Sequence, residues 1–204
     1  MRTYLKWILL LACFFELTSC TSLSHQQSAP TQNQTAIPEN RVTVLSNIKS
    51  WDLKGLIAIR NAKDAWSANW QWTQNPKDYT INLVGPLGSQ SIQLTGSPHS
   101  VQLETSDGKK FQSDSPESLL EKQLGWRLPV SSLYYWIRGL PVPSLPAEKQ
   151  FDSANRLTVL VQQGWRIEYL RYSTVNQIDL PGKMVLNNAL LNVKIIVNEW
   201  KIKR

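Results

Sequence analysis

Cysteine is scarce in this sequence, with only Cys13 and Cys20 among 204 residues. Cys13 lies in an N-terminal apolar run that we expect to be removed, so the remaining chain has one thiol and cannot form an internal disulfide. Histidine is equally rare, since only His25 and His99 occur. The sequence therefore excludes a disulfide-stapled domain and offers neither the cysteines nor the clustered histidines of a metal site.

Catalytic and nucleic-acid-binding motifs are also missing. No run of basic residues accompanies the net charge of +7, so nucleic acid is not an expected partner. A triad of His99, Ser100 and Asp107 is conceivable, but no nucleophile-elbow sequence surrounds the serine. Glu117 and Glu121 are better explained as solvated charges on a helix than as an acid/base pair. We expect no enzyme activity and no cofactor, and no nucleotide motif is present.

The N-terminus has the features of a secretory signal. Arg2 and Lys6 precede an apolar run over residues 7–15, and small residues then lead to Cys20. This run is too short and wrongly flanked for a membrane span, so we predict a signal peptide over residues 1–19. The stretch 17–20 has the form of a lipobox, which ends on the cysteine that becomes the first mature residue. We predict lipidation of Cys20, the alternative being a plain secreted protein.

An acylated Cys20 determines location. Two or three acyl chains anchor a protein permanently, because each buried CH₂ contributes about 0.8 kcal/mol. Thr21 follows the cysteine, and the absence of an acidic residue there favours the outer membrane. The mature chain of residues 20–204 has a net charge of +6, since Arg2, Lys6 and Glu16 leave with the signal. A modest positive charge suits anionic lipid headgroups.

Beyond the lipid site, the sequence divides into a tether and a domain. Residues 21–39 are rich in Ser, Gln, Thr, Asn and Pro and bury too little to fold, so we predict a lipidated cysteine and flexible tether over residues 20–39. Residues 40–204 form a single domain in this interpretation. Its pattern predicts a short helix over residues 40–51 with Asn40 as the cap, and then a run of antiparallel hairpins from residue 53 to residue 109.

Helical signals return in the middle of the domain. Ser115 is a suitable N-cap and Gly125 a suitable end for one helix, and a second helix is expected over residues 133–138, capped by Ser131 or Ser132. Prolines then exclude regular structure until about Phe151. Five further strands are expected over residues 157–161, 165–169, 184–186, 190–197 and 200–202.

This order predicts a mainly β, α+β fold: one large curved sheet with two helices over or inside its concave face. Ten apolar side chains are expected on that face: Ile57, Ile59, Trp66, Trp70, Trp72, Tyr79, Ile81, Leu83, Ile92 and Leu94. Two interpretations are open. Such a face is usually a filled core, whereas the high tryptophan content favours the wall of an apolar cavity.

One loop is unusual. Pro86, Leu87 and Gly88 lie in a short connection between two strands, and Leu87 is a large aliphatic residue at its tip. It either folds back onto the core or stays exposed, where it would enter a bilayer or a groove on a partner.

These features together resemble a known family, the outer-membrane lipoprotein receptor of the lipoprotein-localisation (Lol) pathway, LolB. The resemblance spans about residues 48–203. The matching pieces are the lipobox ending at Cys20, the Pro86–Ser89 loop after a strand over residues 79–83, Trp136–Pro141, Trp165–Tyr169, Leu180-Pro181 and Trp200–Ile202.

The resemblance implies an incomplete antiparallel β-barrel with a helical lid around an apolar cavity. It implies that the protein accepts acylated lipoproteins from a soluble periplasmic carrier and inserts them into the inner leaflet of the outer membrane, without nucleotide. The loop leucine of that family, matched here by Leu87, is needed for insertion. The implied partners are the carrier, the lipoprotein cargo and outer-membrane phospholipid. We expect a monomer that faces the periplasm from a lipid anchor.

A second function also fits the residues. A structural or assembly lipoprotein of the outer membrane would use its sheet to bind envelope proteins or cell wall. That hypothesis predicts a filled core and no affinity for acyl chains.

Overall fold

The computed structural model describes residues 38–88 and 90–203, all within one compact unit that spans residues 33–204. The predicted signal peptide, Cys20 and most of the predicted tether lie outside the described residues, so those predictions stay predictions. Within the described ranges, no helix is long and apolar enough to cross a membrane.

The described chain is dominated by one antiparallel sheet of eleven strands. The helices are α2 (Glu39–Asn47), α3 (Pro116–Leu124) and α4 (Val130–Trp136), with a one-turn segment η1 (Pro86–Gly88). The strands of the first half are β1 (Trp51–Arg60), β2 (Ala65–Gln74), β3 (Tyr79–Val84), β4 (Ser91–Ser97), β5 (Ser100–Thr105) and β6 (Lys110–Ser113). Those of the second half are β7 (Glu148–Phe151), β8 (Leu157–Gln162), β9 (Trp165–Val175), β10 (Ile178–Asn187) and β11 (Asn192–Ile202).

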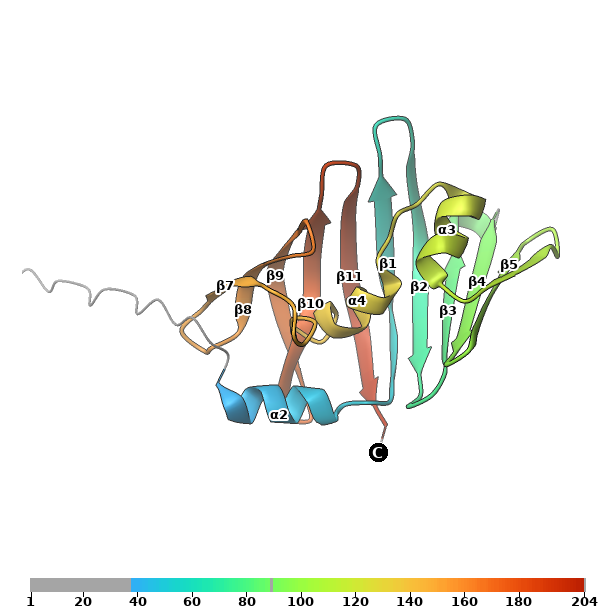
Figure 1. The fold of residues 1–204 in the computed structure, drawn as a ribbon. Coiled ribbons are helices and arrows are strands. Elements are labelled where there is room, and N and C mark those ends of the chain that lie inside the picture. Colours follow the sequence, from blue (N-terminus) through green and yellow to red (C-terminus); the bar gives the residue numbers. More distant parts are fainter. Residues whose placement is uncertain (1–37, 89, 204) are drawn as a thin grey trace, which may run out of the picture. The chain divides into compact units, whose positions relative to one another are not determined.

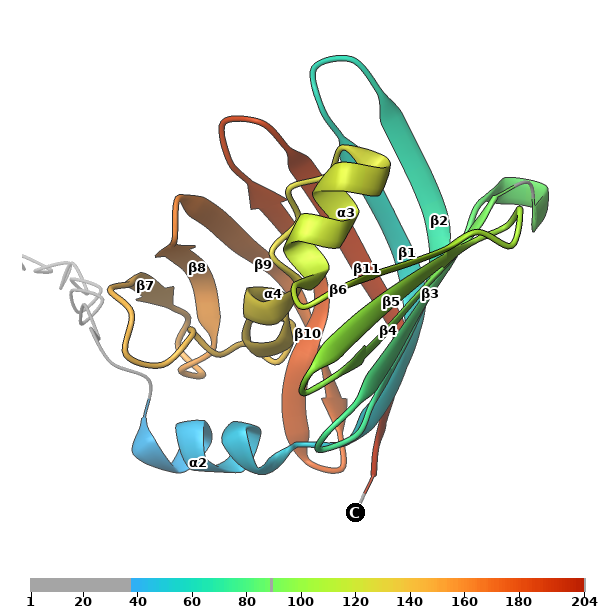
Figure 2. The same ribbon diagram turned by 45° about the vertical axis from the view of Figure 1, so that its right-hand side comes forward.

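The sheet is a barrel left open on one side. Its strand order is β6-β5-β4-β3-β2-β1-β11-β10-β9-β8-β7, so β1 and β11 join the two halves while β6 and β7 are the two edges. The chain leaves the sheet at one edge and returns at the other, and the connection over residues 114–147 therefore has to cross the open side. It carries α3 and α4, which lie over the concave face (Figures 1 and 2). The predicted incomplete barrel with a helical lid is confirmed.

Local signals explain the elements that position the lid. Along β2, Ala68, Trp70 and Trp72 are buried and their neighbours are exposed or only partly buried, as the period of two predicts. The Ser115 hydroxyl accepts a hydrogen bond from the backbone N–H of Ser118, and Gly125 ends α3 with φ +72°. The alternation and both ends of this helix are confirmed.

Two predicted elements were wrong in their bounds. Helix α4 begins at Val130 after Pro129, not at residue 133, and the predicted caps do not cap it. The Ser132 hydroxyl donates instead to Gln163 Oε1 at 2.5 Å. Helix α2 likewise begins before Asn40 and ends at residue 47. In both helices a proline, with its fixed φ, precedes the first turn where we expected a polar cap.

The C-terminal strands were predicted too short. The two strands predicted over residues 190–197 and 200–202 are one strand, β11, which begins only at Asn192. It has a bulge at Asn198, since Lys54 pairs with Glu199 but Gly55 pairs with Val197. A β-carbon at Gly55 would lie 1.8 Å from the Ile196 carbonyl oxygen, so glycine is required at this close approach. Strand β9 continues beyond residue 169 to Val175, and β10 begins at Ile178, before the predicted residue 184. Register shifts around Lys183 break the alternation on which sequence patterns rely.

Arg138 connects the lid helix α4 to the C-terminal end of α2. Its Nη1 donates to the carbonyls of Leu45 and Ile48 at 3.2 and 2.8 Å, and its Nε donates to the Tyr134 carbonyl at 3.0 Å. Its guanidinium carbon lies 4.1 Å from the ring centroid of Tyr134 and 5.2 Å from that of Trp51. The side chain is buried, and burial lowers its pKa. Carbonyl dipoles and aromatic rings thus stabilise the charge, since no carboxylate pairs with it among the described residues.

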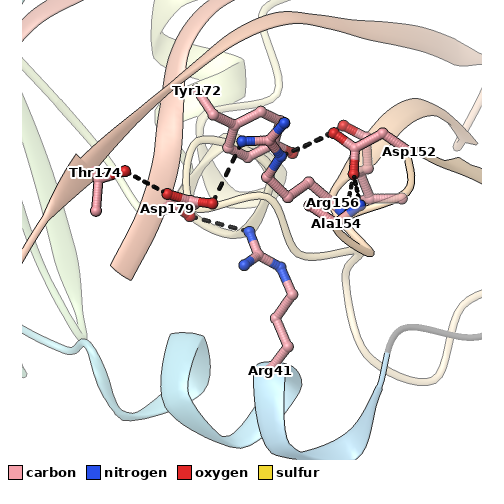
Figure 3. A network of polar contacts seen from close by, with 8 residues as sticks. Arg41, Asp152, Ala154, Arg156, Tyr172, Thr174 and Asp179 are labelled. Atoms are coloured by element: carbon pink, nitrogen blue, oxygen red, sulfur yellow. Dashed lines mark hydrogen bonds and ion pairs between the residues drawn. The ribbon is translucent and has the colours of Figure 1, made fainter. Parts of the chain in front are cut away.

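A second network holds the other part of α2. Arg41 Nη2 donates to the Asp179 carbonyl at 3.0 Å, and the carboxylate of Asp179 accepts from Arg156 at 3.3 Å and from Thr174 at 2.6 Å (Figure 3). Arg156 also pairs with Asp152 at 2.8 Å. This network ties α2 to β9, β10 and the β7–β8 turn, so the helix is fixed across that end of the barrel.

We predict that Arg138→Met lowers the free energy of unfolding by about 3 kcal/mol, because three carbonyl groups, two of them in buried hydrogen bonds, lose a charged donor. Urea denaturation measures the change. Arg127→Met is the matched control, since Arg127 is an exposed lid residue whose ion pair with Glu121 contributes less than about 1 kcal/mol. Equal effects of the two substitutions would contradict the role of Arg138.

Candidate functional site: a lidded apolar hollow and an exposed loop

An apolar hollow lies between the concave face and the lid. The sheet contributes Ile57, Trp70, Ile81, Leu83, Ile92 and Leu94, all of which are among the ten residues predicted for this face. The lid contributes Leu120, Trp126, Leu128, Val130 and Leu133. No polar side chain takes part in this lining, so the hollow suits a hydrocarbon ligand.

The hollow is nearly closed in this conformation. Its volume of about 20 Å³ has room for roughly one water molecule. All of its walls except Trp126 are buried, and Trp70, Leu120 and Leu133 are at most 3% exposed. An acyl chain therefore enters only if part of the lid moves away from the sheet.

Four of the predicted cavity residues lie elsewhere in the core. Ile59 and Trp72 are buried outside the hollow, and Trp72 donates to Gln74 Oε1 at 3.1 Å. Trp66 packs its ring against Trp126 of the lid, with centroids 5.0 Å apart. Tyr79 contacts Trp72, with ring centroids 6.4 Å apart.

Tyr79 is held in an apolar environment. Burial, followed by the nearby Glu117 carboxylate, raises the pKa of its phenol well above the ordinary value. Its hydroxyl, like Trp51 Nε1, has no hydrogen-bond partner among the described residues. A β-carbon at Gly96 would lie 2.2 Å from the Tyr79 ring, so only glycine leaves room for the ring at this position.

The site has no group of metal-ligating side chains within the described ranges.

The two lid helices are attached differently. Helix α4 is tied by polar groups: Trp136 Nε1 donates to Gln162 Oε1 at 3.0 Å, and the Tyr169 hydroxyl donates to the Trp136 carbonyl at 3.0 Å. Helix α3 meets the sheet through Leu119 and Leu120, and no hydrogen bond joins it to strands β1–β5 in the described part of the chain. The two helices are joined to each other, because Glu117 Oε1 of α3 accepts a hydrogen bond from the Ser131 backbone N–H of α4 at 2.8 Å. The described hydrogen bonds therefore fasten α4, but not α3, to the strands.

The loop between β3 and β4 exposes its leucine completely. Leu87 therefore does not fold back onto the core, one of the two alternatives that the sequence left open. Its backbone lies in the left-handed region, with φ +57° and ψ +19°, and Gly88 follows at φ +71°. A leucine in that region is strained. The loop thus keeps an apolar side chain in water on a strained backbone, and both features lower the stability of the folded protein. This combination indicates that Leu87 has a functional role.

Sequence reasoning missed half of the lining. Leu120 and Leu133 lie within the helices that we predicted, but Trp126, Leu128 and Val130 lie between them in a segment without a regular period. Their role depends on the lid crossing the open side, which no local pattern indicates.

The chain matches known proteins over this whole unit. The family described as "Outer membrane lipoprotein LolB" matches residues 49–200. An outer-membrane lipoprotein LolB from Pseudomonas syringae pv. syringae is 35% identical over 201 residues, covering 98% of both chains. One from Pseudomonas aeruginosa is 37% identical over 185 residues, covering 91% of this chain and 90% of the relative.

Solved structures share the fold at much lower identity. A LolA superfamily protein from Nitrosomonas europaea has a TM-score of 0.54 at 7% identity and covers 83% of this chain and 94% of its own. A putative outer-membrane lipoprotein-sorting domain from Vibrio parahaemolyticus has a TM-score of 0.53 at 6% identity and covers 80% and 91%. At such identity the likeness concerns the fold alone.

We predict that Leu87→Asn leaves the free energy of unfolding unchanged or raises it by up to about 1 kcal/mol, because asparagine tolerates the left-handed region. Leu87→Val lowers it, since a β-branched residue is disfavoured there. Urea denaturation gives the free energies of unfolding of both variants. A Leu87→Val variant more stable than the Leu87→Asn variant would contradict a strained backbone at this position.

Proposed function

The chain belongs to the LolB family of outer-membrane lipoproteins, and on that premise we propose that it accepts acylated lipoproteins from a periplasmic carrier and inserts them into the inner leaflet of the outer membrane. Family membership makes it a lipid-anchored protein of that membrane, and we propose Cys20 as the anchor site. The single observation that carries the proposal is the wholly apolar lining of the hollow between the concave face and the lid.

Acceptance would proceed through the α3 half of the lid. An incoming acyl chain replaces the contacts that Leu120 and Trp126 make with the sheet, so the apolar surface exposed by opening is covered again by the chain. Helix α4 keeps its hydrogen bonds during this exchange. Burial of each CH₂ contributes about 0.8 kcal/mol, which offsets the cost of moving the helix.

The direction of cargo transfer would be set only by differences in affinity for the acyl chains. No nucleotide site takes part, so the cargo moves from the carrier to this hollow and then to the bilayer only if each step binds the acyl chains more tightly. A tenfold preference per step corresponds to about 1.4 kcal/mol, roughly the burial of two CH₂ groups. This mechanism involves no bond-making step, and we propose no enzyme activity.

The loop with Leu87 would make the contact for release. Its tip consists of Pro86, Leu87 and Gly88, and Leu87 is the most exposed large apolar side chain of the described residues. A leucine that enters the bilayer gains about 1.5–3 kcal/mol relative to water, which brings the domain to the membrane at the moment of transfer.

The alternative is a structural or assembly lipoprotein that binds envelope proteins or cell wall. One observation favours it, namely that the hollow is almost filled by its own side chains. The two functions differ in whether the domain has affinity for acyl chains.

A transfer assay separates them. The chain from Thr21 onward, which lacks the anchor, is mixed with a LolA-like carrier loaded with an acylated lipoprotein, and we predict that the cargo moves to it without nucleotide. A photoreactive group in the acyl chain should then label β3, β4 and the lid segment 120–133. Cargo that stays on the carrier would support the structural function instead.

We predict that Leu87→Glu blocks delivery to membranes while the variant folds and accepts cargo normally, because Leu87 is fully exposed and does not line the hollow. Delivery is measured as cargo recovered in vesicles after transfer. Leu145→Glu is the matched control, since Leu145 is also an exposed leucine in a loop. Normal delivery by the Leu87→Glu variant, or a failure of the control, would contradict the role of the loop.

A further inference from the structure

A second hollow lies on the opposite, convex side of the sheet. It has a volume of about 390 Å³ and is lined by Leu56, Ala58, Ser67, Pro86, Lys194 and Ile196. Leu56 and Ala58 point outward here, because Ile57 and Ile59 between and beyond them are buried on the concave side. The loop that carries Leu87 forms one wall, so this hollow and the exposed leucine are neighbours.

A row of apolar residues, interrupted by Asn69 of β2, crosses the strands at this level. The pairing Val84–Asn69–Leu56–Ile196 runs across β3, β2, β1 and β11. Leu56 and Val84 are both exposed, although an outward face of an antiparallel sheet is normally polar. Since Val84 is the last residue of β3, the loop leaves the sheet at this row. We call the side chains of Leu56, Val84, Pro86, Leu87 and Ile196 the outer patch.

Cations lie beside the outer patch, at the β1–β2 hairpin and on β10 and β11. Lys194 lines the hollow, and Lys183 pairs with Ile196 from the neighbouring strand. Arg60 and Lys63 lie on the β1–β2 hairpin beyond it, where Asp64 is the one acidic residue. None of these four cations forms an ion pair with another residue in the part of the chain that the structure describes. The local charge is therefore positive beside an apolar surface.

We propose that the outer patch binds an anionic phospholipid of the target bilayer, with an acyl chain in the hollow and the phosphate at Lys194. This rests on the proposed function and adds a second contact to the one made by Leu87. The composition favours lipid over protein, because the patch has no aromatic residue, whereas protein interfaces concentrate Trp, Tyr and Arg. Aliphatic side chains with flanking lysines match acyl chains and phosphates.

The contact defines how the domain lies on the membrane. With the outer patch on the bilayer, the outer wall at β1, β2 and β11 faces the lipid. The lid covers the concave side and faces away from it (Figure 2). The lid then stays accessible to a carrier while the loop is inserted.

Single cysteines test this arrangement. Residues 21–204 contain no cysteine, and every described element lies in one compact unit of that range, so the chain from Thr21 onward is a suitable background. Leu56→Cys, Leu87→Cys and Leu170→Cys variants receive an environment-sensitive fluorophore and are mixed with vesicles of phosphatidylethanolamine and phosphatidylglycerol at about three to one. Leu170 is the matched control, an exposed strand leucine on β9 outside the patch.

We expect the fluorescence emission of the labels at positions 56 and 87 to shift to shorter wavelength and to be quenched by brominated phospholipid. The emission of the label at position 170 should stay as it is in water. A label at 56 that behaves like the one at 170, while the label at 87 inserts, overturns the outer patch and leaves the proposed function standing. If the label at 87 also stays in water, the membrane step of the proposed function fails, and the outer patch fails with it.

A charge variant tests the phosphate contact separately. Lys194→Gln should weaken vesicle binding about fivefold, since a lysine near an anionic surface contributes about 1 kcal/mol, and it should have no effect with vesicles of neutral lipid. Lys77→Gln, an exposed lysine in the β2–β3 turn, is the control and should bind as the unchanged chain does. Equal binding by both variants would overturn the role of Lys194.

Discussion

The buried guanidinium of Arg138 fixes the lid and helix α2 to the open barrel. Arg138 donates to carbonyls of the α2 end and of α4 and lies over the rings of Trp51 and Tyr134. Because an unpaired buried charge would be costly, these groups have to stay together. One end of the lid is thereby fixed to the barrel. The other end, α3, packs on the sheet through Leu119 and Leu120 and is hydrogen-bonded to α4 through Glu117. On the proposed function, this is the end that moves when an acyl chain enters.

On the proposed function, the side chains of the lid occupy the hollow until an acyl chain of the cargo displaces them. These side chains fill most of the space between the helices and the sheet, and an acyl chain has to compete with them. Net affinity is then a difference between two similar burials and stays moderate. Moderate affinity suits an intermediate station, since a protein that held acyl chains too tightly would not release them into a bilayer.

Much of this architecture was predictable because it rests on local chemistry. The alternation over Ala68, Trp70 and Trp72, the Ser115 cap and the Gly125 end are each set by a few neighbouring residues. The bulge at Asn198 and the long strands β9 and β10 were missed, because a bulge breaks the period of two. Trp126 and Arg138 were missed for another reason: their roles depend on contacts across the fold, and nothing in the adjacent sequence indicates them. The exposure of Leu87 was one of two alternatives until the geometry of its loop decided it.

Helix α2 and the loop with Leu87 lie at different levels of the barrel. The helix leads directly into β1 at Trp51, and the loop leaves the sheet at the level of Leu56, five residues or about 17 Å further along the strand. With the lipid on Cys20, as we propose, residues 20–38 span at most about 60 Å. Anchor and loop can thus reach the same bilayer, and the length of this segment sets the effective concentration of the loop at the lipid surface. On that proposal, lengthening or shortening the segment before α2 would change how readily the loop reaches the lipid.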